Sequence, residues 1–164
     1  MSAEETMDFG ELMGRFGEDF GLEGFGPGED GAWSVEIDGM PISFVELADP
    51  PRVRMTAPVC DLPEKGVGAF SQVLLEAMFM GRATGGAHFF VENGENTVFL
   101  QRTDPLPTLD LAGFKEVLER FTNILEQWRQ LGTEFRASGV DLEKARQAAA
   151  EEAHQMSADG FMRV

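Results

Sequence analysis

The chain has 164 residues, 43% of them hydrophobic, which is long enough for one globular core and short for two. Its 13 Lys and Arg against 29 Asp and Glu give a net charge of -16, which repels phosphate backbones and anionic lipid. Nucleic-acid and membrane-surface roles are therefore not expected. The charge favours basic partners, and it equally serves to keep a chain with 14 Phe and 9 Met soluble.

The first predicted element is a helix over residues 7–20, where apolar residues recur with a period near 3.6 and acidic residues fall opposite them. The apolar stripe includes Met13 and Phe16. Ahead of this helix the chain is acidic, at Glu4 and Glu5, where a signal peptide would be basic and then apolar, so we expect a cytoplasmic protein. The glycine-rich run 21–31 ends the helix and indicates a loop.

A β-hairpin is predicted next, because apolar and polar residues alternate on both sides of the Asp38-Gly39 pair, which favours a two-residue turn. Closing the hairpin on that turn sets three apolar pairs opposite one another: Trp33 with Phe44, Val35 with Ile42, and Ile37 with Met40. Both strands then carry their apolar residues on one face.

After the Asp49-Pro50-Pro51 break, a third strand is expected, in which apolar residues alternate with Arg52, Arg54 and Thr56. We expect Pro58 and Pro63 to bracket a loop that carries Cys60.

Residues 66–80 predict a second helix with apolar side chains nearly all round, interrupted by a narrow polar sector at Gln72 and Glu76. A single sheet covers only one side of such a helix. The second cover is either another subunit, which we favour in a chain this small, or the third helix of the same chain.

A second hairpin follows, with strands over 87–92 and 95–102 and a turn at Asn93-Gly94. Counting from the turn pairs Phe89 with Val98 on one face. The opposite face carries His88, Phe90, Thr97 and Phe99. Because both faces hold apolar side chains, this part of the sheet is covered, or can be covered, on both sides.

The last predicted element is a third helix that begins after Asp110 as N-cap and packs on the sheet through an apolar stripe. We expect a domain over residues 1–136 and a helical or frayed tail over 137–164, which is rich in Ala, Glu and Gln. The fold class is thus α+β: helix, three antiparallel strands, helix, two-strand hairpin and helix, plus a C-terminal helical tail.

Residues for catalysis are scarce in this chain, which has no tyrosine and two histidines, His88 and His154. Cys60, the only cysteine, cannot form an internal disulfide or a two-thiol redox pair, and it is more simply a small buried residue than a nucleophile. The run 28–31 lacks the ligand pattern of a calcium loop. We expect no enzyme activity, no metal and no cofactor.

The run 74–87, LLEAMFMGRATGGA, resembles the leucine-rich helix and G-x-x-T-G-G-A turn of class I type III secretion chaperones, the Tir-chaperone family. Weaker matches support it in the same order along the chain: Phe16-Gly17 with Gly21-Leu22, residues 36–39, residues 100–102, and Trp128-Arg129. The resemblance covers residues from about 7 to 131, and it includes the order and spacing of these motifs as well as their sequence.

The resemblance implies a homodimer whose second helices meet, through Leu75, Met78 and Phe79. It also implies a secreted effector protein as partner, whose unfolded N-terminal segment is kept soluble and competent for secretion, with no nucleic acid and no membrane insertion. The residues expected to bind that segment are Met13, Phe16, Val45, Phe90 and Phe99. For Met13 and Phe16, and for Phe90 and Phe99, packing in the core is the alternative.

A second interpretation keeps the fold and changes the partner. The chain would then be a generic, non-catalytic binding or regulatory module, such as an export chaperone of another pathway or an anti-regulator that sequesters a protein.

Overall fold

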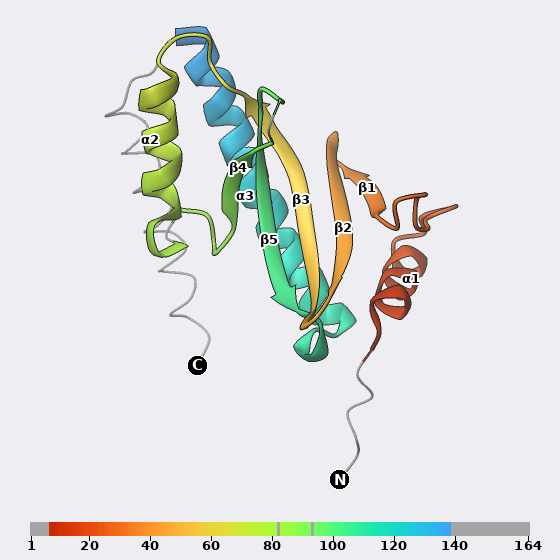
Figure 1. Ribbon diagram of the computed structural model, residues 1–164. Helices are drawn as coiled ribbons and strands as arrows, with labels where there is room; N and C mark the ends of the chain where they lie inside the picture. The colour runs from red at the N-terminus through yellow and green to blue at the C-terminus, as the bar shows by residue number, and fades with distance from the viewer. Residues whose placement is uncertain (1–6, 82, 93, 139–164) are drawn as a thin grey trace, which may run out of the picture. The chain divides into compact units, whose positions relative to one another are not determined.

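In the computed structural model, residues 7–81, 83–92 and 94–138 are described, and their helices and strands follow one another in the predicted order (Figure 1). The elements are α1 (Phe9–Asp19), β1 (Trp33–Ile37), β2 (Met40–Ala48), β3 (Pro51–Asp61), α2 (Val67–Met78), β4 (His88–Val91), β5 (Thr97–Pro105) and α3 (Leu111–Ser138). Two short 3-10 helices, η1 (Phe79–Gly81) and η2 (Leu106–Thr108), precede β4 and α3. The strands form a sheet of order β1-β2-β3-β5-β4. The predicted α+β fold is therefore confirmed, while the predicted tail lies outside the described residues from 139 onward.

The chain forms two compact units, which are described separately below. The first unit consists of Met1–Pro58 and Gln101–Thr122, and the second consists of Val59–Leu100 and Asn123–Val164. Strands β3 and β5 and helix α3 each contribute residues to both units.

In the first unit, the predicted hairpin register is confirmed, because Trp33 lies opposite Phe44, Val35 opposite Ile42 and Ile37 opposite Met40. Strand β3 then pairs antiparallel with β2, with Ser43 opposite Thr56 at one end and Ala48 opposite Pro51 at the other. Turn chemistry and apolar alternation specify the same pairing, so the chain has no competing register that also buries its apolar face.

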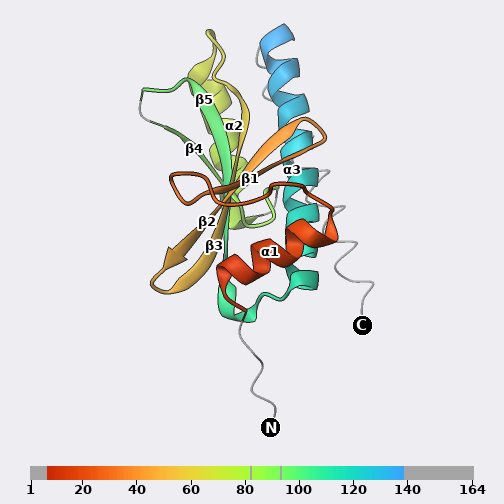
Figure 2. The same ribbon diagram turned by 90° about the vertical axis from the view of Figure 1, so that its right-hand side faces the viewer.

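Helix α1 of this unit begins at its N-cap Asp8, whose side chain accepts a hydrogen bond of 2.8 Å from the backbone N–H of Glu11. Its apolar stripe packs through Phe16, whose ring lies 6.0 Å from that of Phe44 and 5.3 Å from that of Phe114 in α3. Figure 2 shows α1 and the first turns of α3 on the same side of β2 and β3. Both helices therefore cover the face of the sheet that carries Phe44.

The second unit is organised around the C-terminal half of α3. The ring of Phe135 packs edge-on against Phe70 of α2 at 5.2 Å, and Trp128 packs against Phe89 of β4 at 4.9 Å. The indole Nε1 of Trp128 also donates to the carbonyl of Ala83 at 3.1 Å, which fixes the turn between α2 and β4. One long helix thus anchors α2, the turn and β4.

Two sequence predictions need correction. Cys60 lies in β3 instead of a loop. Pro58 does not end the strand, because the ladder between β2 and β3 already ends at Ser43 and Thr56, and the missing N–H of Pro58 therefore costs this ladder no hydrogen bond. Helix α2 ends at Met78, two residues before the predicted end, because the backbone leaves the helical region at Phe79, with ψ of 115°, and enters the left-handed region at Met80, with φ of 56°.

Candidate partner-binding surfaces

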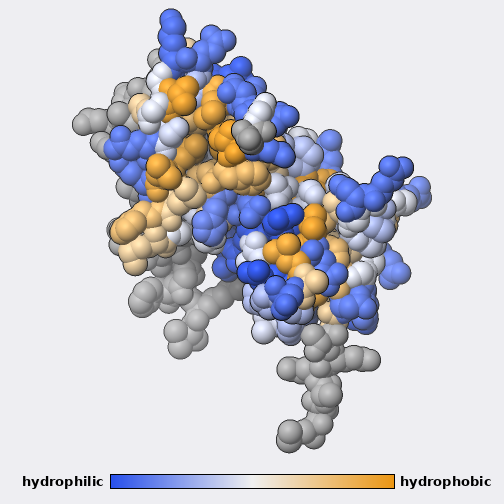
Figure 3. Space-filling view, in the orientation of Figure 1, coloured by the Kyte–Doolittle hydropathy of each residue, from blue (hydrophilic) through white to orange (hydrophobic). Residues whose placement is uncertain are grey.

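An exposed apolar surface runs along α2 and η1 in the second unit. We call it the α2 patch and define it as Val67, Leu75, Phe79 and Met80, of which Leu75 is 65% exposed, Phe79 64% and Met80 75%. Apolar side chains gather over this helix in the space-filling view (Figure 3). Monomeric proteins rarely leave several large apolar side chains together in water, so the α2 patch is a candidate interface.

The opposite flank of α2 is buried within the unit through Phe70, Val73, Leu74 and Ala77. Between the two flanks, the side chain of Gln72 donates a hydrogen bond of 2.8 Å to Glu76, which accounts for the narrow polar sector. The described residues of the chain therefore cover one apolar flank of this helix and leave the other exposed.

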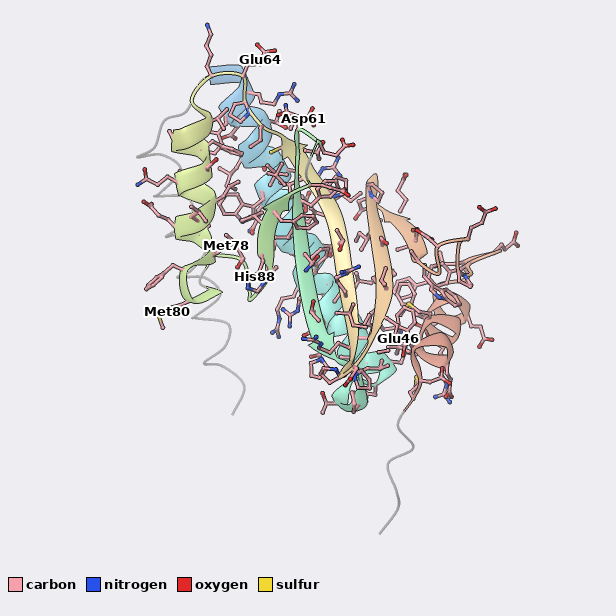
Figure 4. All side chains as sticks on the ribbon, in the orientation of Figure 1. Glu46, Asp61, Glu64, Met78, Met80 and His88 are labelled. Atoms are coloured by element: carbon pink, nitrogen blue, oxygen red, sulfur yellow. The ribbon has the colours of Figure 1, made fainter. Side chains whose placement is uncertain are left out.

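The three residues predicted for dimerisation are not equivalent in the structure. Leu75 and Phe79 lie on the exposed flank, whereas Met78 is half-buried and its Sδ accepts a hydrogen bond of 3.0 Å from the backbone N–H of Phe89. In Figure 4, Met78 lies toward the start of β4, near His88, while Met80 projects away from the helix. Met78 thus belongs to the packing of the unit, and Met80 belongs to its surface.

A second apolar surface lies on the hairpin of the second unit. The rings of Phe90 and Phe99 stack at 5.3 Å with an interplanar angle of 19°, and Phe90 is 36% exposed while Phe99 is half-buried. Phe89 and Val98, expected on the other face, are buried. The two stacked rings therefore form a flat apolar platform on a face that the prediction left free to bind a partner.

In the first unit, Val45 is half-buried on the face of β2 opposite to the buried Phe44. Met13 and Phe16 are 0% and 1% exposed and belong to the core beneath α1. Their side chains offer no accessible surface in the chain as folded, which fits the core-packing alternative. Of the five residues expected to bind a partner, the structure places Val45, Phe90 and Phe99 where one could reach them.

The residues considered for catalysis lack the expected properties of a reactive site. Burial, followed by the negative charge of Asp61, raises the pKa of the Cys60 thiol from an ordinary 9.0 to about 11, so the thiol stays protonated at neutral pH. His88 is exposed on β4. Across the part of the chain that the structure describes, no three His, Cys, Asp or Glu side chains group so that they could hold a metal ion.

Comparison with known proteins identifies the family. The model of the Tir chaperone protein (CesT) family matches residues 11–129, most of the chain. The chain belongs to this family. The predicted family is thereby confirmed, and with it the predicted function as a type III secretion chaperone that binds an effector. No curated protein matches the chain.

Solved structures show the same fold. A chain of the ExsC-ExsE complex has 23% identity and a TM-score of 0.63, over 76% of this chain and 96% of that one. A chain of the HopA1-SchA chaperone-effector complex has 14% identity and a TM-score of 0.61, over 73% and 91%. The Yersinia pestis type III secretion chaperone SycH, in complex with a fragment of YscM2, has 14% identity and a TM-score of 0.55, over 73% and 98%.

Sequence reasoning missed several exposed groups beside the predicted ones. Val67 and Met80 extend the α2 patch, and Val91 is exposed at the end of β4. Helical period does not set Val67 beside Leu75, and Met80 lies beyond the point where α2 ends, so neither could be placed by this period. Of the helices in the described residues, none combines the length and apolar character needed to span a membrane.

Proposed function

We propose that this family member acts in the bacterial cytoplasm as a non-catalytic homodimer that holds the extended N-terminal segment of an effector protein. The observation that carries the proposal is the exposed apolar surface of the second unit, in a chain that belongs to a chaperone family. Holding a segment unfolded needs apolar contact and backbone pairing and requires neither nucleotide nor covalent chemistry.

The two apolar surfaces suit different partners. A helix face such as the α2 patch is suited to its own copy, because a two-fold axis sets the same side chains against each other. The stacked pair Phe90 and Phe99 sits on a strand face, where an extended ligand can lay alternate side chains against flat rings. We therefore assign the α2 patch to the second subunit and the Phe90–Phe99 platform, with Val45, to the effector.

The HopA1-SchA structure is a complex of a chaperone with an effector, and SycH was solved with a fragment of YscM2. These complexes support a polypeptide partner for the present fold. The family match favours this function over the generic binding module.

The test is affinity capture of the tagged protein from its own bacterium, followed by limited proteolysis and mass spectrometry of the captured polypeptide. We expect one secreted protein, protected from protease over an N-terminal segment. Phe90→Glu should weaken capture about fivefold or more, since burying the exposed third of the ring is worth about 0.5–1 kcal/mol and the new charge adds the cost of its desolvation against the segment.

Phe20→Glu is the matched control, because Phe20 is another exposed phenylalanine, at the end of α1. Its capture of the client should equal that of the wild type. Protection of a folded domain instead of a terminal segment, or equal capture by the Phe90 variant with unchanged thermal unfolding, would refute the assignment.

A further inference from the structure

Two arginines stand beside two aliphatic residues on the sheet face of the first unit that α1 and α3 leave uncovered. The register sets Val45 opposite Arg54 and Leu47 opposite Arg52, so the four side chains form two neighbouring cross-strand pairs on one face. All four are half-buried. In Figure 3, apolar side chains over β2 lie beside strongly hydrophilic ones over β3. We call this group the arginine surface.

The charges of the arginine surface are not balanced within the unit. Three other cations of the unit each hold a carboxylate: Arg15 pairs with Glu11, Arg102 with Asp104, and Lys115 with Asp19. The side chains of Arg52 and Arg54 have no hydrogen bond or ion pair to any described residue, although the chain holds 29 Asp and Glu. Glu46, the acidic neighbour in sequence, lies opposite Val53 and so belongs to the other face of the sheet.

One donor atom of the arginine surface lacks both contact with solvent and an acceptor in the described part of the chain. The Nε of Arg52 is shielded from solvent and has no acceptor among the described residues. An N–H donor that is withdrawn from water without an acceptor costs free energy, and a guanidinium can donate two parallel hydrogen bonds to one carboxylate. Arg102 shows this geometry in the same unit, with its Nε and Nη2 each 2.7 Å from an oxygen of Asp104.

We propose that the arginine surface docks a segment of the client polypeptide in which a Glu or Asp side chain is flanked by aliphatic residues. The carboxylate would accept hydrogen bonds from Arg52 and Arg54, and the aliphatic neighbours would contact Val45 and Leu47. A nucleic acid or an anionic membrane is disfavoured, because two guanidinium groups cannot offset the repulsion of a chain with net charge -16. This inference rests on the proposed function, since it names the chemistry of the held segment.

The experiment measures binding of three synthetic peptides by fluorescence anisotropy to the full-length protein. The peptides share one Val- and Thr-rich frame and carry Glu, Gln or Lys at the same two alternate positions. We expect the Glu peptide to bind about tenfold or more tightly than the Gln peptide, and the Lys peptide least tightly. General attraction to an acidic protein predicts the reverse order, so the ranking itself separates the two explanations.

Variants assign the preference to its residues. Arg52→Gln with Arg54→Gln should remove the preference for Glu over Gln, and Arg52→Lys with Arg54→Lys should retain part of it, because lysine keeps the charge without the fork. Arg120→Gln is the matched control, since Arg120 is exposed on α3 and should leave the ranking unchanged. Thermal unfolding of each variant checks that the fold is kept.

Two results would overturn the inference: a Lys peptide that binds as tightly as the Glu peptide, or a Glu preference that survives in the double Gln variant. A gain in Glu-peptide affinity on Glu151→Gln with Glu152→Gln would identify the acidic C-terminal segment of the chain itself as the occupant, and would overturn it too. Client capture is measured separately. If capture succeeds while the peptides are not discriminated, the proposed function stands and this inference alone fails.

Discussion

Dimerisation through the α2 patch can be tested by replacing Leu75 with glutamate. Leu75 is 65% exposed in the single chain and lies on the flank of α2 that the described residues leave uncovered. The substitution should leave the subunit folded, because the side chain contributes little to its core and glutamate is a good helix former. It should act on association instead.

The magnitude follows from the exposed fraction. Burying a whole leucine side chain is worth about 1.5–3 kcal/mol, so burying the exposed two-thirds is worth about 1–2 kcal/mol. A two-fold interface contains the residue twice, which gives about 2–4 kcal/mol per dimer. Leu75→Glu should therefore raise the dimer dissociation constant about 30-fold to 1,000-fold, before the cost of burying two carboxylates is added.

Multi-angle light scattering across a concentration series measures this change directly. The wild type should be a dimer at micromolar concentration, and Leu75→Glu should be a monomer there with an unchanged circular dichroism spectrum. Phe20→Glu changes an exposed aromatic residue of the first unit and should stay dimeric. A monomeric wild type, or a variant as dimeric as the wild type, would refute the assignment of the α2 patch.

Three further predictions concern stability. A Cβ on Gly132 would lie 2.6 Å from the Sγ of Cys60, so Gly132→Ala should lower the free energy of unfolding by about 1–2 kcal/mol in urea titrations. Gly14 has open space around it, so Gly14→Ala in the same assay should raise the free energy of unfolding by about 0.5–1 kcal/mol. Asp110→Ala removes the acceptor of the 2.7 Å hydrogen bond from the Gly113 N–H and should cost about 1 kcal/mol by the same measure. The pKa of the Cys60 thiol is about 11 in the folded state, against an ordinary 9.0, so its contribution to the free energy of unfolding should be full below pH 9 and lost as the pH rises toward 11. Cys60→Ala should flatten the dependence of the free energy of unfolding on pH between these values.

The first hairpin was predictable in detail because two independent signals agree there. The Asp38-Gly39 turn and the apolar alternation each specify the pairing of Trp33 with Phe44, and the structure has that pairing. The start of α3 was predictable for a similar local reason, since Asp110 supplies a side-chain acceptor one position ahead of an apolar stripe. Local chemistry of this kind needs no knowledge of distant contacts.

The partner-binding residues of α1 show where such reasoning stops. An apolar stripe predicts that one side of a helix is buried, and it does not predict whether the helix packs on its own sheet or on another molecule. Met13 and Phe16 lie on this stripe, and contact with Phe44 and Phe114, both distant in sequence, places Phe16 in the core. The position of Cys60 in β3 was missed because Pro58 is read as a strand breaker unless the end of the neighbouring ladder is known.

The α2 patch and the Phe90–Phe99 platform belong to the second unit and the arginine surface belongs to the first, and their different chemistry bears on how a client could be chosen. The apolar surfaces of the second unit bind any apolar segment, because apolar burial has no direction. These surfaces are formed by Leu75 with Phe79 and by Phe90 with Phe99. Hydrogen bonds from Arg52 and Arg54 have direction, and they would strengthen binding only of a client that carries a carboxylate at one particular place in its sequence. A chain of net charge -16 repels acidic segments in general, so only a segment that delivers its carboxylate to these arginines recovers that loss. Apolar contact would then supply the strength of binding, and the arginine surface would supply its register.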